Sequence, residues 1–255
     1  MYAEERQQAA AQLVMARGRV SVTELAEEFA VTTETVRRDL NALERMRLVR
    51  RVHGGAVPAA SLSAMESGLD ERDLTRSREK ERIGLAAKRL LPGDGGTVAI
   101  DAGSTTARLV GFLAPELRLT AFTHGVPIAA MLAALPAIEL HLLPGRVRAR
   151  TQAAVGSVTT EALERLRVDV VFLGTNGMSA EHGFSTPDPE EAAVKRALVR
   201  AARKVVVLAD SSKFGQDTTV SFAALEDVDV LVTDAQSPSV PLSTFTRRGV
   251  EVVVA

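Results

Sequence analysis

Five polar side chains between residues 33 and 41 have the types and spacing to recognise nucleic acid. They share one face of a predicted helix, and they are Thr33, Thr35, Arg37, Arg38 and Asn41. Their length and hydrogen-bonding groups suit contacts to base edges and phosphates from a helix lying in a major groove. A charged helix face is often merely solvated. Here, however, six arginines stand against two acidic residues between Thr35 and Val57, a local charge of +4, which favours DNA binding.

Two capped helices would position these side chains. Ser21 is expected to begin the first helix, with Glu24 completing a capping box, and Thr32 to begin the second. Both cap residues join the DNA-binding candidates. The inward positions are apolar at helical spacing: Leu25, Ala26 and Phe29 in the first helix, Val36, Leu40 and Leu43 in the second. A supporting helix is predicted over 3–17, ended by Gly18.

A short hairpin is predicted after the second helix. Residues 48–52 form its first strand, Gly54 and Gly55 its turn, and residues 56–57 its second strand. Such a wing would place Arg50, Arg51 and His53 along the DNA backbone or in the minor groove. For His53, a local hydrogen bond in the turn is an equally good interpretation.

A second group of reactive residue types follows the predicted strand 97–100. Asp101 and Gly103 are followed by Ser104, Thr105 and Thr106 at the start of a predicted helix. Hydroxyl groups and free backbone N–H groups there suit an anion, although serine and threonine are also ordinary helix caps. The pattern is neither GxGxxG nor a P-loop, because no GK[ST] follows.

Three further strand ends have similar polar residues, and parallel strands bring such ends to one edge of a sheet. The candidates there are Thr123, His124, Asn176, Asp210 and Lys213. An aspartate there could accept sugar hydroxyls, and Lys213 could meet a phosphate; an exposed loop lysine is the plainer interpretation of Lys213. The sequence therefore predicts a site for a phosphorylated sugar.

Two charged segments give less specific candidates. Glu190 and Glu191 lie in the first turn of a predicted helix, where negative charges interact favourably with the helix dipole. The alternative, more specific hypothesis is that one of these carboxylates enters the sugar site. Arg146, Arg148 and Arg150 follow another strand end. One of them, with Arg148 as the candidate, would hold the anion, or all three form a solvated charge run.

Short apolar runs alternate with helical patterns from Gly93 onward. The strand candidates are 97–100, 119–122, 138–143, 169–174, 204–209, 228–233 and 250–254. Helical patterns lie near 105–114, 126–134, 157–166, 189–203 and 242–247, and Ser77 is expected to cap an earlier helix running to Leu91. Near-continuous Val, Ile and Leu strands indicate burial on both faces, hence a mostly parallel α/β sheet flanked by helices.

Composition and charge along the sequence indicate how the chain is divided into domains. We expect a winged helix-turn-helix domain over 1–57, a linker over 58–78 and an α/β sensor domain over 79–255. The charge is segregated: residues 1–57 have nine basic and eight acidic residues, and the rest 22 against 24. No cysteine is present, and the four histidines show no metal-ligand spacing, so neither metal nor cofactor is expected. No apolar run approaches the roughly 18 residues of a membrane-spanning helix, and no signal peptide appears, so we expect a cytoplasmic protein.

Five ordered motifs resemble the DeoR family of bacterial transcriptional regulators. The stretch VSVTELAEEFAVTTETVRRDLNALE with RRVHGGA is similar to its DNA-binding head. VAIDAGSTTARL, VDVVFLGTNGM, GFSTPDPEEAAVKRA and VVVLADSSKFG resemble its sensor domain, whose fold is similar to ribose-5-phosphate isomerase. The resemblance implies a sugar-phosphate effector, and a likeness to fructose-operon members of actinobacteria implies fructose 1-phosphate. Arg47, His124 and Pro144 depart from the family pattern.

We therefore expect a sequence-specific DNA-binding repressor of a sugar operon, not an enzyme, released from its operator by a phosphosugar. A dimer or tetramer would bind two half-sites about 34 Å apart. An activator fits the sequence equally well. The alternative is a phosphosugar isomerase with a DNA-binding appendage, but an isomerase needs a positioned base, and no carboxylate cluster is apparent.

Overall fold

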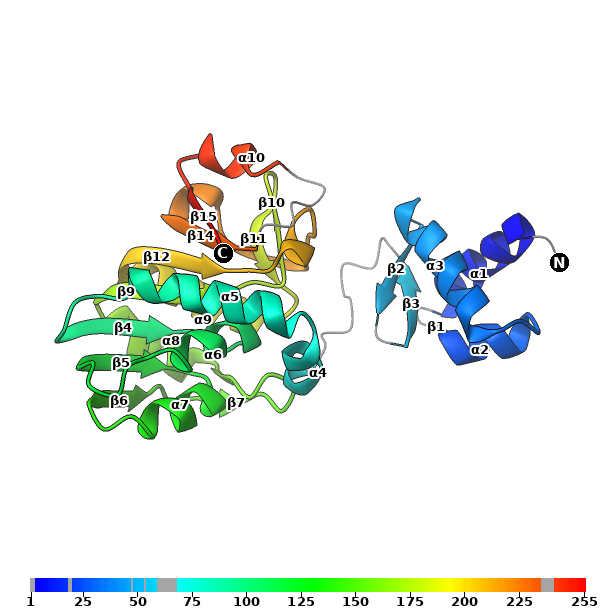
Figure 1. Ribbon diagram of the computed structural model, residues 1–255. Helices are drawn as coiled ribbons and strands as arrows, with labels where there is room; N and C mark the ends of the chain where they lie inside the picture. Colours follow the sequence, from blue (N-terminus) through cyan, green and yellow to red (C-terminus); the bar gives the residue numbers. More distant parts are fainter. Residues whose placement is uncertain (1–2, 18–19, 47, 53, 59–67, 235–240) are drawn as a thin grey trace. The chain divides into compact units, whose positions relative to one another are not determined.

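The computed structural model describes residues 3–17, 20–46, 48–52, 54–58, 68–234 and 241–255. The chain divides into two compact units, Met1–Ala64 and Met65–Ala255 (Figure 1). Arg47, His53 and residues 59–67 of the predicted linker lie outside the described residues.

The first unit packs three helices against a small antiparallel sheet. Its elements are α1 (Ala3–Arg17), β1 (Val20–Ser21), α2 (Val22–Glu28), α3 (Thr33–Arg45), β2 (Val49–Val52) and β3 (Gly55–Pro58). Val14, Leu25 and Leu40 are fully buried in its core. The predicted helices and wing hairpin are confirmed. The pairing of β1 with β3 is additional, and it makes Gly55 necessary because a Cβ there would lie 2.2 Å from the carbonyl oxygen of Val20.

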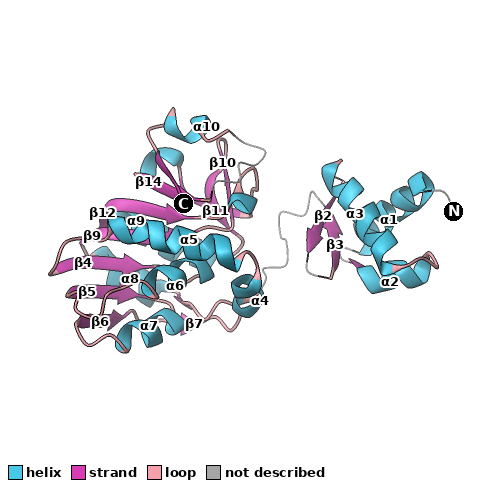
Figure 2. Ribbon diagram, in the orientation of Figure 1, coloured by secondary structure: helices cyan, strands magenta, loops and turns pink. Residues whose placement is uncertain are grey.

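The second unit is built on a seven-stranded parallel sheet in the order β15-β14-β12-β9-β4-β5-β6, whose strands are labelled in Figure 1 and shown in magenta in Figure 2. Its strands are β4 (Gly96–Ile100), β5 (Leu119–Thr123), β6 (Ile138–Leu142), β9 (Val168–Gly174), β12 (Ala202–Leu208), β14 (Val230–Thr233) and β15 (Glu251–Val254). The main helices are α5 (Ser77–Ala87), α6 (Ser104–Val110), α7 (Val126–Ala133), α8 (Ser157–Glu164), α9 (Pro189–Ala201) and α10 (Ser243–Thr246). All seven predicted strands are confirmed.

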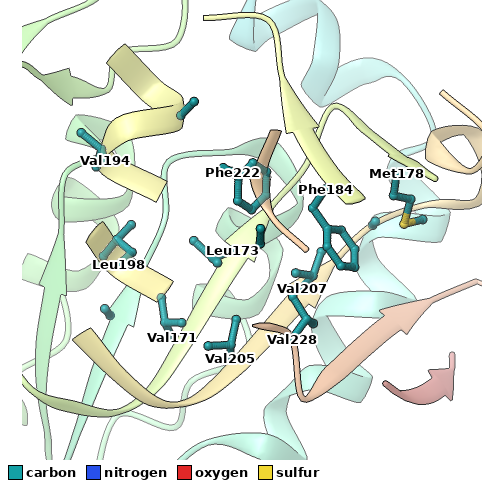
Figure 3. Close-up of a cluster of buried hydrophobic side chains, with 14 of the residues drawn as sticks. Val171, Leu173, Met178, Phe184, Val194, Leu198, Val205, Val207, Phe222 and Val228 are labelled. Carbon is teal, nitrogen blue, oxygen red and sulfur yellow. The ribbon is translucent and has the colours of Figure 1, made fainter. Parts of the chain in front are cut away.

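The sheet is buried on both faces, as its continuous apolar strands predict. Successive residues of β9 alternate between two cores: Val171 and Leu173 lie in one, and Val170 and Phe172 in the other. Figure 3 shows the first of these cores, which includes Phe184 and residues of α9. With both faces covered, the carboxyl edge of the strands is left to form a site.

Several short elements were not predicted. An antiparallel sheet joins β10 (Gly177–Ser179), β11 (Gly183–Thr186) and β13 (Val220–Ala223), and β7 (Arg146–Val147) pairs with β8 (Ala154–Val155). Three 3-10 turns cover Lys88–Leu90, Ser211–Lys213 and Leu225–Asp227. Strands of two to four residues are too short to show the alternation by which a strand is recognised.

Two expectations about the start of the second unit need revision. Helix α4 (Leu69–Leu74) lies within the segment predicted to be a linker, and it packs on α6. The prediction that Ser77 caps α5 is wrong. The cap position is Arg76, in the left-handed region at φ 52°, and no side chain makes a capping hydrogen bond there. The Arg76 side chain instead reaches across to Ser211, with a 2.8 Å hydrogen bond.

Candidate functional site: a DNA-binding helix and an anion pocket

Helix α3 presents the predicted DNA-contacting side chains to solvent. Thr33, Arg37, Arg38 and Asn41 are exposed. Arg37 forms a 3.5 Å ion pair with Glu34, one turn back on the same helix. On the opposite side, buried Asp39 accepts a 2.5 Å hydrogen bond from Arg6 of α1. Because that bond fixes α1 against α3, the exposed face is held on a rigid base.

Ser21 and Thr32 use their side chains to cap the helices that they begin. Ser21 Oγ accepts from the amide of Glu24 at 3.0 Å, and the Glu24 carboxylate accepts from the Ser21 amide at 2.7 Å, which completes the predicted capping box. Thr32 Oγ1 accepts from the amide of Thr35 at 3.2 Å, and the two threonine hydroxyls lie 3.0 Å apart. Thr35 is half-buried, so its hydroxyl is less open than that of Thr33.

The wing is tied to α3 by hydrogen bonds. Arg51 donates through Nη1 to Asn41 Oδ1 at 2.5 Å, and its amide donates to Glu44 at 2.8 Å. Burial lowers the pKa of Arg50, partly offset by Glu44. Within the described part of the chain, Arg50 Nη2 and Arg51 Nε are buried without a hydrogen-bond partner. Because these two atoms are buried, a phosphate contact from Arg50 or Arg51 would have to use the other donors of their guanidinium groups.

A small polar pocket lies at the carboxyl edge of the parallel sheet in the second unit. Its volume is about 100 Å³. The lining residues are Arg72, Thr75, Lys80, Gly103, Ser104, Thr105, Gly174, Thr175, Asp210 and Lys213. The structure thus brings together five of the predicted effector-binding residues: Gly103, Ser104, Thr105, Asp210 and Lys213.

The charge of this pocket favours an anion. Arg72, Lys80 and Lys213 line it, against the single carboxylate of Asp210. Lys80 is only 4% exposed, and burial lowers its pKa to about 8, although Asp210 acts in the opposite direction. Burial alone would raise the pKa of Asp210, but Lys213 and the hydrogen bonds of Ser212 lower it below its usual value. A bound anion would offset the excess positive charge.

Asp101 lies behind the pocket rather than on its surface. It is fully buried, and its carboxylate accepts from the Gly174 amide at 2.8 Å and from the Lys195 ammonium. The other carboxylate oxygen is 2.9 Å from His124 Nε2. Burial would raise the pKa of Asp101, but Lys195 and His124 together lower it to about 2. Asp101 and His124 therefore anchor the ends of β4, β5 and β9 from inside.

Two predicted threonines also support the pocket from within. Thr106 donates to the carbonyl of Asp101 at 2.7 Å, and Thr123 donates to the carbonyl of Ile100 at 2.6 Å. Both are fully buried. Their hydroxyls shape the strand-to-helix turns and do not line the pocket.

Three other predicted residues lie outside the pocket lining. Arg148 pairs with Glu191 and, at 3.1 Å, with Asp188. Glu190 pairs with Arg146. Asn176 accepts from Thr186 at 3.2 Å. The sequence suggested the helix dipole for the glutamates and a solvated charge run for the arginines, and it did not predict the ion pairs between the two segments.

Sequence reasoning missed the wall supplied by Arg72, Thr75 and Lys80. These residues precede the sheet in the chain, and Lys80 has the appearance of an ordinary surface lysine on an amphipathic helix. It also missed Lys195, which is buried between Asp101 and the carbonyl of Gly174. The one sequence feature that distinguishes Lys195 is its position one helical turn after Glu191 on α9.

Comparison with known proteins identifies the family. Residues 6–61 match the model of the DeoR-like helix-turn-helix domain, and residues 75–235 match that of the DeoR C-terminal sensor domain. This chain belongs to the DeoR family. The first matched region of this DeoR-family chain contains α3, and the second contains every lining residue of the polar pocket except Arg72.

Curated relatives of this DeoR-family chain are named as regulators. It is 36% identical to the uncharacterized HTH-type transcriptional regulator FruR of Bacillus subtilis over 85% of each chain. It is 31% identical to the glycerol-3-phosphate regulon repressor of Escherichia coli over 94% of each chain. Among solved structures, ribose 5-phosphate isomerase A of Neisseria gonorrhoeae is a distant likeness at 16% identity and TM-score 0.37, over 53% of this chain and 52% of its own. The chain is a DNA-binding transcriptional regulator, not an enzyme.

Two kinds of feature are absent from the described residues. No cluster of three or more His, Cys, Asp or Glu side chains there could hold a metal ion. No helix among them has the length and apolar character needed to cross a membrane.

Proposed function

We propose that this protein represses a sugar-uptake or catabolic operon and leaves its operator when a phosphorylated sugar binds the polar pocket. The observation that supports this most directly is the pocket's charge, with three cationic side chains against one carboxylate. DNA binding belongs to residues 1–57, and effector binding to residues 79–255 together with α4 and the turn that follows it.

The chemistry of these side chains suggests which of them contact the phosphate of the ligand and which contact its sugar. A phosphate dianion suits Arg72, Lys80 and Lys213, because each offers a charged donor. Thr75, Thr105 and Asp210 supply hydroxyl and carboxylate oxygens that can exchange hydrogen bonds with sugar hydroxyls. A cavity of about 100 Å³ admits little more than the phosphate, so the sugar extends from it.

Fructose 1-phosphate is our first candidate for the effector. The motifs resemble those of fructose-operon regulators, and the Bacillus subtilis relative bears the name FruR. We propose a dimer or tetramer that places two copies of α3 in successive major grooves, about 34 Å apart.

Thermal unfolding of the full-length protein with a panel of phosphosugars tests the effector. A ligand that binds only the native state raises the melting temperature by mass action. The panel contains fructose 1-phosphate, fructose 6-phosphate, ribose 5-phosphate and tagatose phosphates, each paired with its unphosphorylated sugar. A shift with fructose 1-phosphate but not with fructose supports the proposal, and no shift with any phosphosugar would exclude the pocket as their site.

Repression itself is tested by recovering the operator. Full-length protein would select duplexes from a random library, and the enriched sequence would be placed between a promoter and a reporter gene. We expect lower reporter output when the protein is expressed, and recovery when the effector accumulates. Increased output on expression would identify an activator instead.

A further inference from the structure

Helix α4 forms one wall of the anion pocket, and this wall comes from a different part of the chain than the rest. Arg72 belongs to α4, and Thr75 to the turn after it. Every other lining residue comes from α5, from the end of a sheet strand, or from the turns and helix starts that follow such strands. In sequence, α4 comes directly after residues 59–68, which connect it to the last strand of the DNA-binding unit.

Arg72 is the pocket cation with the least internal compensation. No hydrogen bond or ion pair of its guanidinium group is found within the described part of the chain. The backbone of the same residue is engaged, because its carbonyl oxygen accepts a hydrogen bond from Lys80 Nζ. One ligand in the pocket can therefore act on α4 twice, through the Arg72 side chain and through Lys80.

The other contacts of α4 hold it to the sensor unit at its ends. The Leu69 amide donates to the carbonyl of Arg150 at 3.1 Å. Asp73 accepts from Arg108 at 2.9 Å, and that ion pair is partly exposed. A partly exposed ion pair contributes little, and a six-residue helix is not stable alone. The position of α4 thus depends on its packing against α6 and on a few polar contacts.

We propose that Arg72 binds the phosphate of the effector, and that through Arg72 the occupied pocket fixes α4 and so transmits binding to the segment that leads to the DNA-binding unit. This inference rests on the proposed function, and it names the residue that couples the effector pocket to the DNA-binding unit. A ligand changes an equilibrium only by binding its two states with different affinity. Arg72 supplies that difference, because its contact with the ligand exists only when α4 lies against the pocket.

The test separates ligand binding from coupling. Operator affinity of the full-length protein would be measured by fluorescence anisotropy without ligand and at saturating fructose 1-phosphate, and the ligand affinity by calorimetry. The quantity of interest is the ratio of the two operator dissociation constants, for which couplings of about 5–150-fold are typical. The variants are Arg72→Ala, Arg72→Lys, Thr105→Ala from the opposite wall, and Arg78→Ala as an exposed arginine outside the pocket.

In Arg72→Ala we expect weaker ligand binding and a ratio close to one even at saturation, with partial recovery in Arg72→Lys. Thr105→Ala should bind ligand more weakly but reach the wild-type ratio once saturated, and Arg78→Ala should match the wild type in both measurements. A wild-type ratio in saturated Arg72→Ala would overturn the inference and leave the effector site intact. Absence of ligand binding by the wild type would instead contradict the proposed function.

Hydrogen exchange in the wild type provides a second readout that needs no variant. Saturating fructose 1-phosphate should slow exchange of the α4 amides, whereas α8, which does not line the pocket, should be unaffected. Equal exchange of α4 with and without bound ligand would overturn the inference.

Discussion

At the scale of single residues, the two functions depend on different side chains. Arg38 is exposed on α3, and Lys213 lines the anion pocket. We predict that Arg38→Ala weakens operator binding by about 1–3 kcal/mol, the range for a lost base contact, and leaves ligand affinity unchanged. Lys213→Ala should retain operator binding and lose induction. Loss of operator binding in a folded Lys213→Ala protein, measured by anisotropy and circular dichroism, would refute this division.

Lys80 should give effector binding a distinct pH dependence. Its pKa is lowered by burial from 10.5 to about 8, so the free pocket loses this charge as pH rises through 8. An anion favours the protonated lysine, and a sugar phosphate is already largely a dianion above pH 7. Affinity for fructose 1-phosphate should therefore fall by up to about tenfold per pH unit above 8.

Calorimetry between pH 7 and 9.5 measures this dependence. Lys80→Met should bind more weakly and lose the fall in affinity, whereas Lys88→Met, on an exposed side chain nearby, should retain the wild-type profile. An affinity that stays constant through this range in the wild type would show that Lys80 does not meet the ligand.

Asp101 should matter for stability more than any exposed carboxylate. It is fully buried and paired with Lys195 and His124. We predict that Asp101→Asn destabilises the protein by about 3–5 kcal/mol, because it leaves the buried ammonium of Lys195 without its counter-charge. Urea unfolding measures the change. Asp94→Asn, which removes an exposed partner of Arg118, is the matched control and should cost less than about 1 kcal/mol.

At the scale of elements, the wing depends on a glycine that has no room for a side chain. A Cβ at Gly55 would lie 2.2 Å from the carbonyl oxygen of Val20, whereas Gly54, at φ 75°, has nothing within 4 Å. We predict that Gly55→Ala separates β3 from β1 and lowers operator affinity strongly. Gly54→Ala should cost only the backbone strain, about 1–2 kcal/mol.

Both variants should bind fructose 1-phosphate as the wild type does, because the substitutions lie in the DNA-binding unit. Operator titrations and calorimetry on the same preparations give the comparison. Equal operator affinities for the two variants would show that the contact between β3 and β1 is unimportant for DNA binding.

The elements were predicted from the sequence where their signal is local. The capping box at Ser21 and Glu24 and the apolar runs of the seven parallel strands are set by neighbouring residues, and the structure contains them. Gly103, Ser104, Thr105, Asp210 and Lys213 follow strand ends, so the edge rule for parallel sheets brings them together.

The other lining residues of the pocket could be identified only from the folded structure. Arg72, Thr75 and Lys80 reach the sheet edge only because α4 and α5 pack there, and nothing in their spacing indicates it. Conversely, Asp101 has the residue type and position of a ligand contact, but Lys195 and the Gly174 amide occupy its carboxylate. Partners so far apart along the chain cannot be paired from one sequence.

At the scale of the whole molecule, the central claim is that a phosphosugar in the sensor domain changes the affinity of α3 for DNA. Linkage makes such an effect reciprocal: if the ligand weakens operator binding, the operator must weaken ligand binding by the same factor. A coupling between two sites reaches a constant factor once the pocket is filled, whereas direct competition by the anion for the basic face of α3 would raise the operator dissociation constant without limit as the anion concentration rises.

The most direct measurement is an anisotropy titration of the selected operator duplex with full-length protein, with and without saturating fructose 1-phosphate. We predict that the ligand raises the operator dissociation constant by about 5–150-fold, while fructose and an equal ionic strength of sulfate do not. An operator affinity that is unchanged or increased, at a concentration where calorimetry shows the pocket to be filled, would contradict this account.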